Sequence, residues 1–500
     1  MQWTRVGIHE ILICMAEDNH APAVTIDTLP DNIFREIFRE VVTFKFYISE
    51  PCPYWLSRYP EAHATAWQRL VQVCQRWRNI IFGSPRYLDL HLHCSEETPF
   101  WENSSCWPEF PLTLKYTISP DEDDDDVIFA LKHPDRVRRV DLSIRHSDSI
   151  VHEVLEVMEV PFPALTHLDL AGPDSEDDPE IFDLSGRFLG QSAPCLEHIH
   201  LDAISFPALP KLLSSARGLV CLELRNIHAT CYKHLSSKAM VGGLAGLTKL
   251  INLSINFTYT DEDPSYYELP QKRSRPMRAT LPALTQFKFT GECDYLEALI
   301  AQIDTPQVEV FKVAYPTPEV QTSQLSQYFD RTERLESARF RRAQVSFDRG
   351  KAQIELDRSQ GECDQVCLSL SVAIEDDYYN VPCLLDQLDD ILSDVDHLSV
   401  EMGRYWTNRG DRSETSKWLA FLRIFPAVEV LCVSGGIAVN IASTLENIPG
   451  ESVTEVLPAL RLLHLRNGDE PVGSIERFVS LRGLSDCPVT VVDTQDGINE

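Results

Sequence analysis

The sequence predicts an α/β protein in which a small helical module precedes a long parallel sheet covered by helices on one side. Two observations lead to this prediction. Near the N-terminus, apolar residues recur at helical spacing, with too little neighbouring helix to bury them all. From residue 137 onward, short apolar strands alternate with helical segments, which is the pattern of a parallel sheet with crossover helices.

The composition is that of a folded protein and narrows the class of its partners. The 500 residues are 43% hydrophobic and 24% charged, which excludes a wholly disordered chain. With 76 acidic against 45 basic residues, the formal net charge is −31. A surface this acidic repels phosphate backbones and anionic lipids. We therefore expect neither nucleic acid nor a membrane among the partners.

The cysteines and the apolar segments bear on the compartment. No apolar stretch reaches the ~18 consecutive residues that span a bilayer. His9 and Glu10 interrupt the apolar residues near the N-terminus, so no signal peptide is expected. The 14 cysteines are scattered, mostly in apolar surroundings, as reduced buried thiols are. We expect a cytoplasmic and/or nuclear protein, with the basic stretch 272–278 either a nuclear signal or, more simply, an exposed loop.

The N-terminal module follows a leader, residues 1–24, that we expect to be flexible. Apolar residues at positions 33, 34, 37, 38 and 41 form one broad face of a helix, and Pro30 suits its first turn. A second helix carries the apolar residues Trp67, Leu70, Val71, Val73, Cys74, Trp77, Ile80 and Ile81. Residues 45–65, with three prolines, are interpreted as an inserted loop. A partner groove, or the rest of the chain, must cover the surplus apolar surface.

These residues resemble an F-box. The resemblance rests on Leu29-Pro30-Asp31 with Ile33 and Phe34, on Val73-Cys74 with Trp77, and on Ser84-Pro85-Arg86-Tyr87-Leu88, about 60 residues in all. The sequence departs from the compact motif by its inserted loop, and long surface insertions cost little free energy. The resemblance implies an F-box at 25–90 that binds the Skp-type adaptor of a cullin–RING ubiquitin ligase. By this resemblance the adaptor-binding residues are Leu29, Pro30, Ile33, Ile37, Phe38, Leu70, Val73, Cys74 and Trp77.

The rest of the chain repeats one phrase, apolar-x-x-apolar-x-apolar, at a mean spacing of about 29 residues. The phrase begins at Val137, Leu165, Leu196, Leu219, Leu250, Leu284, Val308, Leu335, Cys367, Val395, Val428 and Leu460. Segments 150–158, 296–303 and 384–392 between the phrases are predicted helices. The array, residues 137–490, resembles a leucine-rich-repeat horseshoe. We expect the horseshoe to be irregular, because the spacing varies and the usual asparagine after the strand is mostly absent. Residues 91–136 would link it to the module or cap it.

A search for catalytic chemistry finds no motif. The glycine-containing segments at 241–246 and 433–437 lack the spacing of nucleotide-binding loops, and there is no Gly-x-Ser-x-Gly elbow. His91, His93 and Cys94 form one possible metal cluster, but Cys94 would point away from both histidines on a strand, so a plain strand is the better interpretation. We predict no catalytic residue, no metal and no cofactor.

The function that follows from both resemblances is that of a non-catalytic substrate-recognition subunit of an SCF-type (Skp–cullin–F-box) E3 ubiquitin ligase. The F-box would hold the adaptor, and the repeats would hold a target protein near the rest of the ligase. The alternative is a repeat-based protein-interaction scaffold that acts outside any ubiquitin ligase. Adaptor binding distinguishes the two.

A candidate target-binding surface lies between the apolar anchors of the phrases, because these residues point away from the core. The residue after the second anchor is Lys288, Lys312 and Arg339 in three successive phrases, with Arg341 two residues further on. In register these four would form a basic stripe, flanked by Ser254 on one side and Ser371 on the other. Such a stripe would suit an acidic or phosphorylated segment of the target. Otherwise nearby carboxylates neutralise it.

Overall fold

A computed structural model describes most of the chain. The described residues are 26–43, 66–119, 125–145, 149–173, 182–228, 231, 234–258, 278–317, 323–336, 340–348, 350–357, 367–373, 388–402, 414–466 and 475–493. The chain divides into two compact units, Met1–Lys115 and Tyr116–Glu500. The predicted leader 1–24, the inserted loop 45–65 and the basic stretch up to residue 277 lie outside the described residues.

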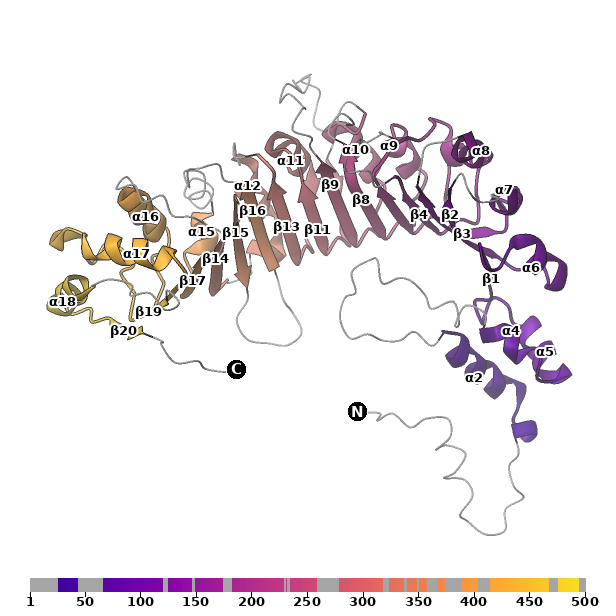
Figure 1. The fold of residues 1–500 in the computed structure, drawn as a ribbon, viewed down its shortest axis with the longest axis horizontal. Coiled ribbons are helices and arrows are strands. Elements are labelled where there is room, and N and C mark those ends of the chain that lie inside the picture. The colour runs from indigo at the N-terminus through magenta and orange to yellow at the C-terminus, as the bar shows by residue number, and fades with distance from the viewer. Residues whose placement is uncertain are drawn as a thin grey trace, which may run out of the picture. The chain divides into compact units, whose positions relative to one another are not determined.

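The first unit contains the helical module and a short parallel strand pair. Its elements are η1 (Ile26–Thr28), α2 (Asp31–Thr43), α4 (Ala66–Leu70), α5 (Gln75–Phe82), β1 (Leu92–Ser95), α6 (Phe100–Cys106) and the start of β2 (Leu112–Ile118). Helix α2 packs against both α4 and α5 (Figure 1). Strands β1 and β2 are parallel, with Leu92 opposite Leu112.

Trp67 on α4 fixes the module to the strand pair. Its side chain is 1% exposed, and its indole N–H donates to the carbonyl of His91, 3.2 Å away. Its ring contacts Trp107 and Phe110 edge to face, with centroids 5.1 and 5.4 Å apart. Edge-to-face aromatic pairs stabilise beyond the area that they bury. Trp67 is therefore the centre of the first unit's core.

The second unit is a mixed α/β structure built on one large, mostly parallel sheet. The strand order is β3-β4-β6-β8-β9-β11-β13-β16-β15-β14-β17-β18-β19-β20. These strands are β3 (Val137–Ile144), β4 (His167–Ala171), β6 (His198–Asp202), β8 (Cys221–His228), β9 (Asn252–Thr258), β11 (Gln286–Thr290), β13 (Val310–Tyr315), β14 (Arg342–Asp348), β15 (Lys351–Asp357), β16 (Cys367–Ala373), β17 (His397–Met402), β18 (Val430–Ser434), β19 (Leu462–Arg466) and β20 (Thr490–Asp493). Two short parallel pairs, β5 (Phe182–Asp183) with β7 (Ile204–Ser205) and β10 (Ala279–Thr280) with β12 (Ile303–Asp304), lie outside this sheet.

Helices connect most of the successive strands. They are α7 (Asp125–Leu131), α8 (Ser149–Val157), α9 (Leu209–Leu213), α10 (Ser237–Leu244), α11 (Cys293–Ile300), α12 (Ser323–Arg331), α13 (Glu333–Glu336), α15 (Asp389–Leu392), α16 (Glu414–Arg423), α17 (Ile437–Glu446) and α18 (Glu476–Leu484), with the 3-10 turns η3 (Phe188–Gln191) and η5 (Gly450–Ser452). Helices α7 to α11 follow one another along one side of the sheet (Figure 1). The predicted helix 150–158 is confirmed, the one at 296–303 ends at Ile300, and of the one at 384–392 only α15 lies within the described residues.

The core of the second unit lies under the alternating residues of the repeated phrase. Strands β4, β6, β11, β18 and β19 each bury two apolar side chains and leave the intervening polar ones partly exposed. Leu168, Phe287 and Leu463, the predicted core positions of three near-identical phrases, are at most 2% exposed. The period of two along a strand explains this alternation, and it leaves one face of the sheet lined by polar residues.

The strand order departs from the chain order at β14 to β16. These three strands form an antiparallel meander, so that β16 lies beside β13 and β14 lies beside β17. The turn between β14 and β15 places Gly350 at φ 76°, where glycine is favoured. The predicted phrase at Leu335-Ala338-Phe340 is wrong, because Leu335 lies on α13 and the strand begins only at Arg342. Its buried residues are Ala343, Val345 and Phe347.

Candidate functional site

Helix α2 has two apolar stripes that face different surroundings. Phe34 and Phe38 are each 1% exposed and pack on Trp77 of α5, with ring centroids 5.7 and 4.9 Å away. Ile33 and Ile37, one residue earlier in each case and therefore ~100° around the helix, are 41% and 39% exposed. Phe38 is thus a core residue of the module and not part of its exposed surface, because the apolar face predicted as one is divided between core and solvent.

The predicted second helix is two helices separated by a turn. Helix α4 ends at Leu70 and α5 begins at Gln75, with Cys74 as its N-cap. The Cys74 thiol accepts a hydrogen bond from the backbone N–H of Trp77, 3.4 Å away. Val73, in the turn, is 60% exposed. The turn therefore presents an apolar side chain to solvent that a continuous helix would have placed elsewhere.

Arg76 ties the start of α5 to the start of α2. Its guanidinium donates to Asp31 from two nitrogens, at 3.0 and 2.6 Å, and to the carbonyl of Leu29 at 2.6 Å. It also lies over the ring of Phe34, 4.8 Å from the centroid. Paired N–H donors on one carboxylate hold both side chains in a defined geometry. These contacts join the first turns of the two helices.

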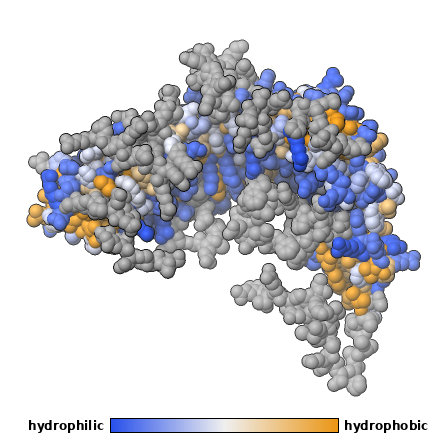
Figure 2. All heavy atoms as spheres, viewed as in Figure 1, coloured by the Kyte–Doolittle hydropathy of each residue, from blue (hydrophilic) through white to orange (hydrophobic). Residues whose placement is uncertain are grey.

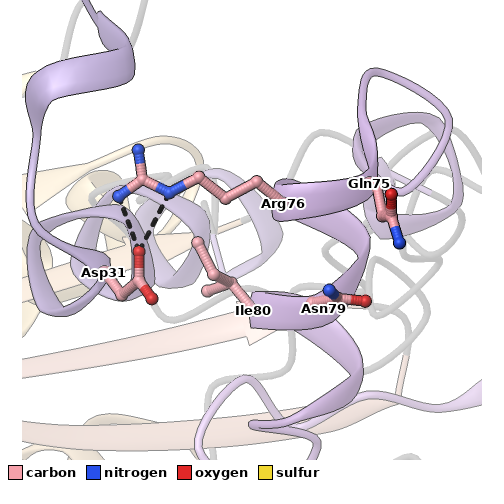
Figure 3. A pocket seen from close by; sticks show the side chains of 5 residues that line it. All are labelled: Asp31, Gln75, Arg76, Asn79 and Ile80. Carbon is pink, nitrogen blue, oxygen red and sulfur yellow. Dashed lines mark hydrogen bonds and ion pairs between the residues drawn. The ribbon is translucent and has the colours of Figure 1, made fainter.

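A shallow pocket of about 420 Å³ lies beside this ion pair, lined by Asp31, Gln75, Arg76, Asn79 and Ile80. Figure 3 shows Arg76 extended toward Asp31, with Ile80 beside the pair and Gln75 and Asn79 on the side of α5 away from Asp31. The lining has one acid and one base that satisfy each other, and no second titratable group.

A second polar cluster lies midway along α2. The hydroxyl of Tyr87 donates to Glu36 and accepts from Arg39 at 3.0 Å, and Arg39 also pairs with Glu36 at 2.8 Å. The hydrogen bond to Glu36 raises the pKa of the Tyr87 phenol, with a smaller effect of burial in the same direction. Tyr87 is 42% exposed, so the cluster is accessible to solvent.

The predicted adaptor-binding residues therefore separate by exposure. Ile33, Ile37, Val73, Pro30 and Cys74 are exposed, Leu29, Leu70 and Trp77 are half-buried, and Phe38 is buried. Figure 2 shows hydrophobic residues gathered on the surface of the helical module. We call the exposed set Ile33, Ile37 and Val73 the module face. The sequence analysis named Asp31 only as part of a motif and did not predict its ion pair with Arg76, because no local pattern relates residues 45 positions apart.

The polar face of the sheet carries part of the predicted basic stripe. Lys288 on β11 and Lys312 on β13 lie directly opposite each other, as predicted. Arg341 does not join them, because β16 and β15 separate β13 from β14; it instead pairs with Asp396 at 2.7 Å. The row continues through Ser254 on β9 and Ser369 on β16, not Ser371. Arg339 lies outside the described residues.

The same row is acidic at its N-terminal end. Asp141, Asp169, His200 and Glu223 occupy successive strands β3, β4, β6 and β8 in register. His200 contacts Asp169 at 2.7 Å. Burial lowers the pKa of the His200 imidazole, but the hydrogen bond and charge of Asp169 outweigh it, and the pKa is raised.

Glu223 is the most deeply placed charge of this region. Its side chain is 1% exposed, accepts from the Asn252 amide at 2.8 Å and pairs with Arg225 at 3.3 Å. Burial, followed by the charge of Glu223, raises the pKa of the neighbouring Cys221 thiol to about 12. A thiol with that pKa is protonated at neutral pH and is a poor nucleophile.

The side chains of the possible metal cluster at 91–94 do not meet at one site. His91 contacts Asp89 at 3.0 Å and Thr113 at 3.2 Å, and Cys94 is 1% exposed in the apolar core. Within the described ranges, no group of three histidine, cysteine or carboxylate side chains is placed to hold a metal ion. Across the same residues, none of the helices has the length and apolarity needed to cross a bilayer.

No protein-family model matches this sequence, and no curated protein matches it significantly. The assignment of a function therefore depends on the residues and geometry described above.

Proposed function

We propose that this protein is the substrate-recognition subunit of an SCF-type E3 ubiquitin ligase, with residues 25–90 as an F-box and the second unit as an irregular leucine-rich-repeat horseshoe. The observation that carries the proposal is the module face. Three aliphatic side chains, two on α2 and one in the turn before α5, are between 39% and 60% exposed, and a small module leaves such a set uncovered where a partner binds. The Leu-Pro and Val-Cys-x-x-Trp elements resemble those of an F-box, and this resemblance makes the Skp-type adaptor the proposed partner.

The support beneath the module face fits this role. Arg76 and Asp31 lock α5 to α2, and the aromatic trio Phe34, Phe38 and Trp77 fills the space between the helices. An interface built on pre-formed helices loses little conformational entropy on binding. The polar face of the sheet supplies a second, separate surface for a target protein.

In this proposal the chain performs no chemistry of its own. It holds a target lysine at high effective concentration beside the ubiquitin-charged enzyme that other subunits recruit. The catalytic side chains belong to those subunits. This agrees with the protonated Cys221 and the self-satisfied Asp31–Arg76 pair, neither of which is arranged as a nucleophile or base.

Affinity purification of the tagged full-length chain from cells tests the proposal. We expect the Skp-type adaptor and a cullin to co-purify with the wild type. The double variant Ile33→Asp/Ile37→Asp should lose both, because a charge would enter an apolar interface. The control Ile251→Asp, at a residue 44% exposed in the second unit, should keep both. A wild-type chain that captures other proteins but neither of these two is instead a scaffold outside the ligase.

A further inference from the structure

Tyr87 joins the segment that follows α5 to the middle of helix α2. Its hydroxyl donates to the Glu36 carboxylate and accepts from the Arg39 guanidinium at 3.0 Å. The same guanidinium lies over the phenol ring, 5.4 Å from its centroid, and pairs with Glu36 at 2.8 Å. Each of these three side chains therefore contacts the other two.

The phenol of Tyr87 is accessible to an enzyme. Its side chain belongs to a residue that is 42% exposed, whereas the other tyrosines within the described ranges are between 1% and 6% exposed; these are Tyr116, Tyr295, Tyr315 and Tyr328. An enzyme that modifies a hydroxyl must bring it into its own active site. Tyr87 can reach such a site while the module stays folded, and those four tyrosines cannot.

Two arginines of α2 are placed to hold an anion at the phenol oxygen. Arg35 and Arg39 are four residues apart and therefore lie on the same face of the helix. Arg39 already contacts the oxygen. The hydrogen bond to Glu36 raises the pKa of Tyr87, and the charges of Arg39 and Arg35 oppose that rise, so both guanidinium groups act on the phenol. Guanidinium groups are well suited to pair with phosphoryl oxygens.

We propose that Tyr87 is a phosphorylation site and that Arg35 and Arg39 hold the phosphoryl group. A protein tyrosine kinase and ATP supply the reaction. The phenol oxygen attacks the γ-phosphorus, the new O–P bond replaces the bond to the bridging oxygen, ADP leaves, and the phenolic proton passes to a base of the kinase. The product carries nearly two negative charges and three strong acceptor oxygens. It no longer donates to Glu36 and repels that carboxylate, so Arg39 exchanges Glu36 for the phosphoryl group.

This exchange changes the border of the module face. Residues three apart are neighbours on a helix surface, so Glu36 lies beside Ile33, and it directly precedes Ile37. After phosphorylation Glu36 has lost its contacts with Tyr87 and Arg39, and a carboxylate without such partners is costly to desolvate in an interface. Phosphorylation should therefore weaken adaptor binding about tenfold. This consequence rests on the proposed function, whereas the phosphorylation site itself does not.

Mass spectrometry of the tagged full-length chain tests whether the modification occurs. The chain is purified from the cells that naturally produce it, with the tyrosine-phosphatase inhibitor vanadate present. We expect a phosphoryl group on the peptide that contains residue 87 in the wild type, and none on the same peptide in Tyr87→Phe. Recovery of that peptide from the wild type without any phosphorylated form would overturn the proposal.

Phosphorus NMR tests whether the two arginines hold the phosphoryl group. The sample is the full-length chain with phosphotyrosine inserted at position 87 during synthesis. The second pKa of a phosphorylated side chain is about 6. Nearby positive charges favour the dianion, so we expect this pKa to be at least ~0.5 lower in the protein than in a phosphotyrosine peptide.

Two matched variants make the result specific. Arg35→Gln/Arg39→Gln should return the phosphoryl pKa to that of the peptide. The control Arg69→Gln/Arg145→Gln removes two other exposed arginines and should leave it low. A phosphoryl group that titrates like the peptide in the wild-type chain, or that responds equally to both variants, would refute the role of Arg35 and Arg39.

Calorimetry with the purified adaptor tests the consequence for binding. We expect the phosphorylated chain to bind with about tenfold higher Kd than the unmodified chain. Glu36→Gln should remove most of this difference, because no carboxylate is left to lose its partners. Equal affinities of the phosphorylated and unmodified chains would refute the effect on binding. An unmodified chain that does not bind the adaptor would instead contradict the proposed function, and the mass-spectrometric and NMR results would still decide on the site.

Discussion

Trp77 and Ile37 both lie on the helical module, but truncating them should affect different quantities. Trp77→Ala should lower the stability of the module, and Ile37→Ala should lower its affinity for the adaptor. Trp77 packs on Phe34 and Phe38, so Trp77→Ala removes part of the module's core. A fully buried tryptophan costs 3–5 kcal/mol to truncate, and because Trp77 is half-buried we expect about 2–3 kcal/mol. Ile37 is 39% exposed, so Ile37→Ala should cost the fold about 1 kcal/mol or less.

The adaptor affinity should show the complementary effect. Completing the burial of an aliphatic side chain that is about half exposed contributes about 1 kcal/mol. The triple variant Ile33→Ala/Ile37→Ala/Val73→Ala should therefore lose about 3 kcal/mol of binding free energy, which is roughly a 100-fold rise in Kd.

Two assays on the full-length chain separate these effects. Amide hydrogen exchange across α2 reports the opening free energy of the module, and calorimetry with the purified adaptor reports Kd. Trp77→Ala should speed exchange in α2 about 30–150-fold, whereas Ile37→Ala alone should stay within about fivefold of wild type. If Trp77→Ala leaves α2 exchange unchanged, or if the triple variant binds with wild-type affinity, the division of α2 into a core stripe and a binding stripe is wrong.

Three further predictions concern the second unit. Phe287→Asp should lower its unfolding free energy by about 3 kcal/mol or more, because an unpaired charge enters a site that is 0% exposed; an unchanged melting temperature would show that the sheet register is wrong. Arg482→Leu should lower the free energy of unfolding by about 3 kcal/mol, because Arg482 is fully buried and donates to the carbonyls of three loop residues. Arg477→Leu, at an exposed position of the same helix, is the control and should change it little. Equal melting temperatures for the two variants would contradict this. Since the pKa of His200 is raised above 6.5, its pairing with Asp169 stabilises the fold below that pH, and the contribution fades as pH rises through the folded pKa. An NMR titration of Asp169→Asn should find the His200 pKa below 6.5. A pKa unchanged from that of the wild type would exclude the pairing.

The sequence predicted the positions of the strands in the chain more reliably than their order in the sheet. Phrases such as Leu165-Leu168-Leu170 locate buried strands because alternation is a local property of one strand. The order of strands is not local: the meander β14-β15-β16 is fixed by pairing between segments far apart in sequence. The stripe from Lys288 to Arg341 was therefore only half right, because it assumed that successive phrases are adjacent.

The helical module shows the same limit on a smaller scale. The spacing of Ile33, Phe34, Ile37 and Phe38 predicts an amphipathic helix, which α2 confirms. Spacing cannot assign the two stripes to core and solvent, since that depends on where Trp77 comes to lie. The break between α4 and α5 was missed because cysteine is not among the favoured N-cap residues, and Cys74 was counted as one more apolar position.

The most direct test of the central claim is size-exclusion chromatography with light scattering on the purified full-length chain mixed with a purified Skp-type adaptor. The account predicts a one-to-one complex for the wild type and for Ile251→Asp, and two separate species for Ile33→Asp/Ile37→Asp. Separate species with the wild-type chain, or a complex that survives the double substitution on α2, would contradict it.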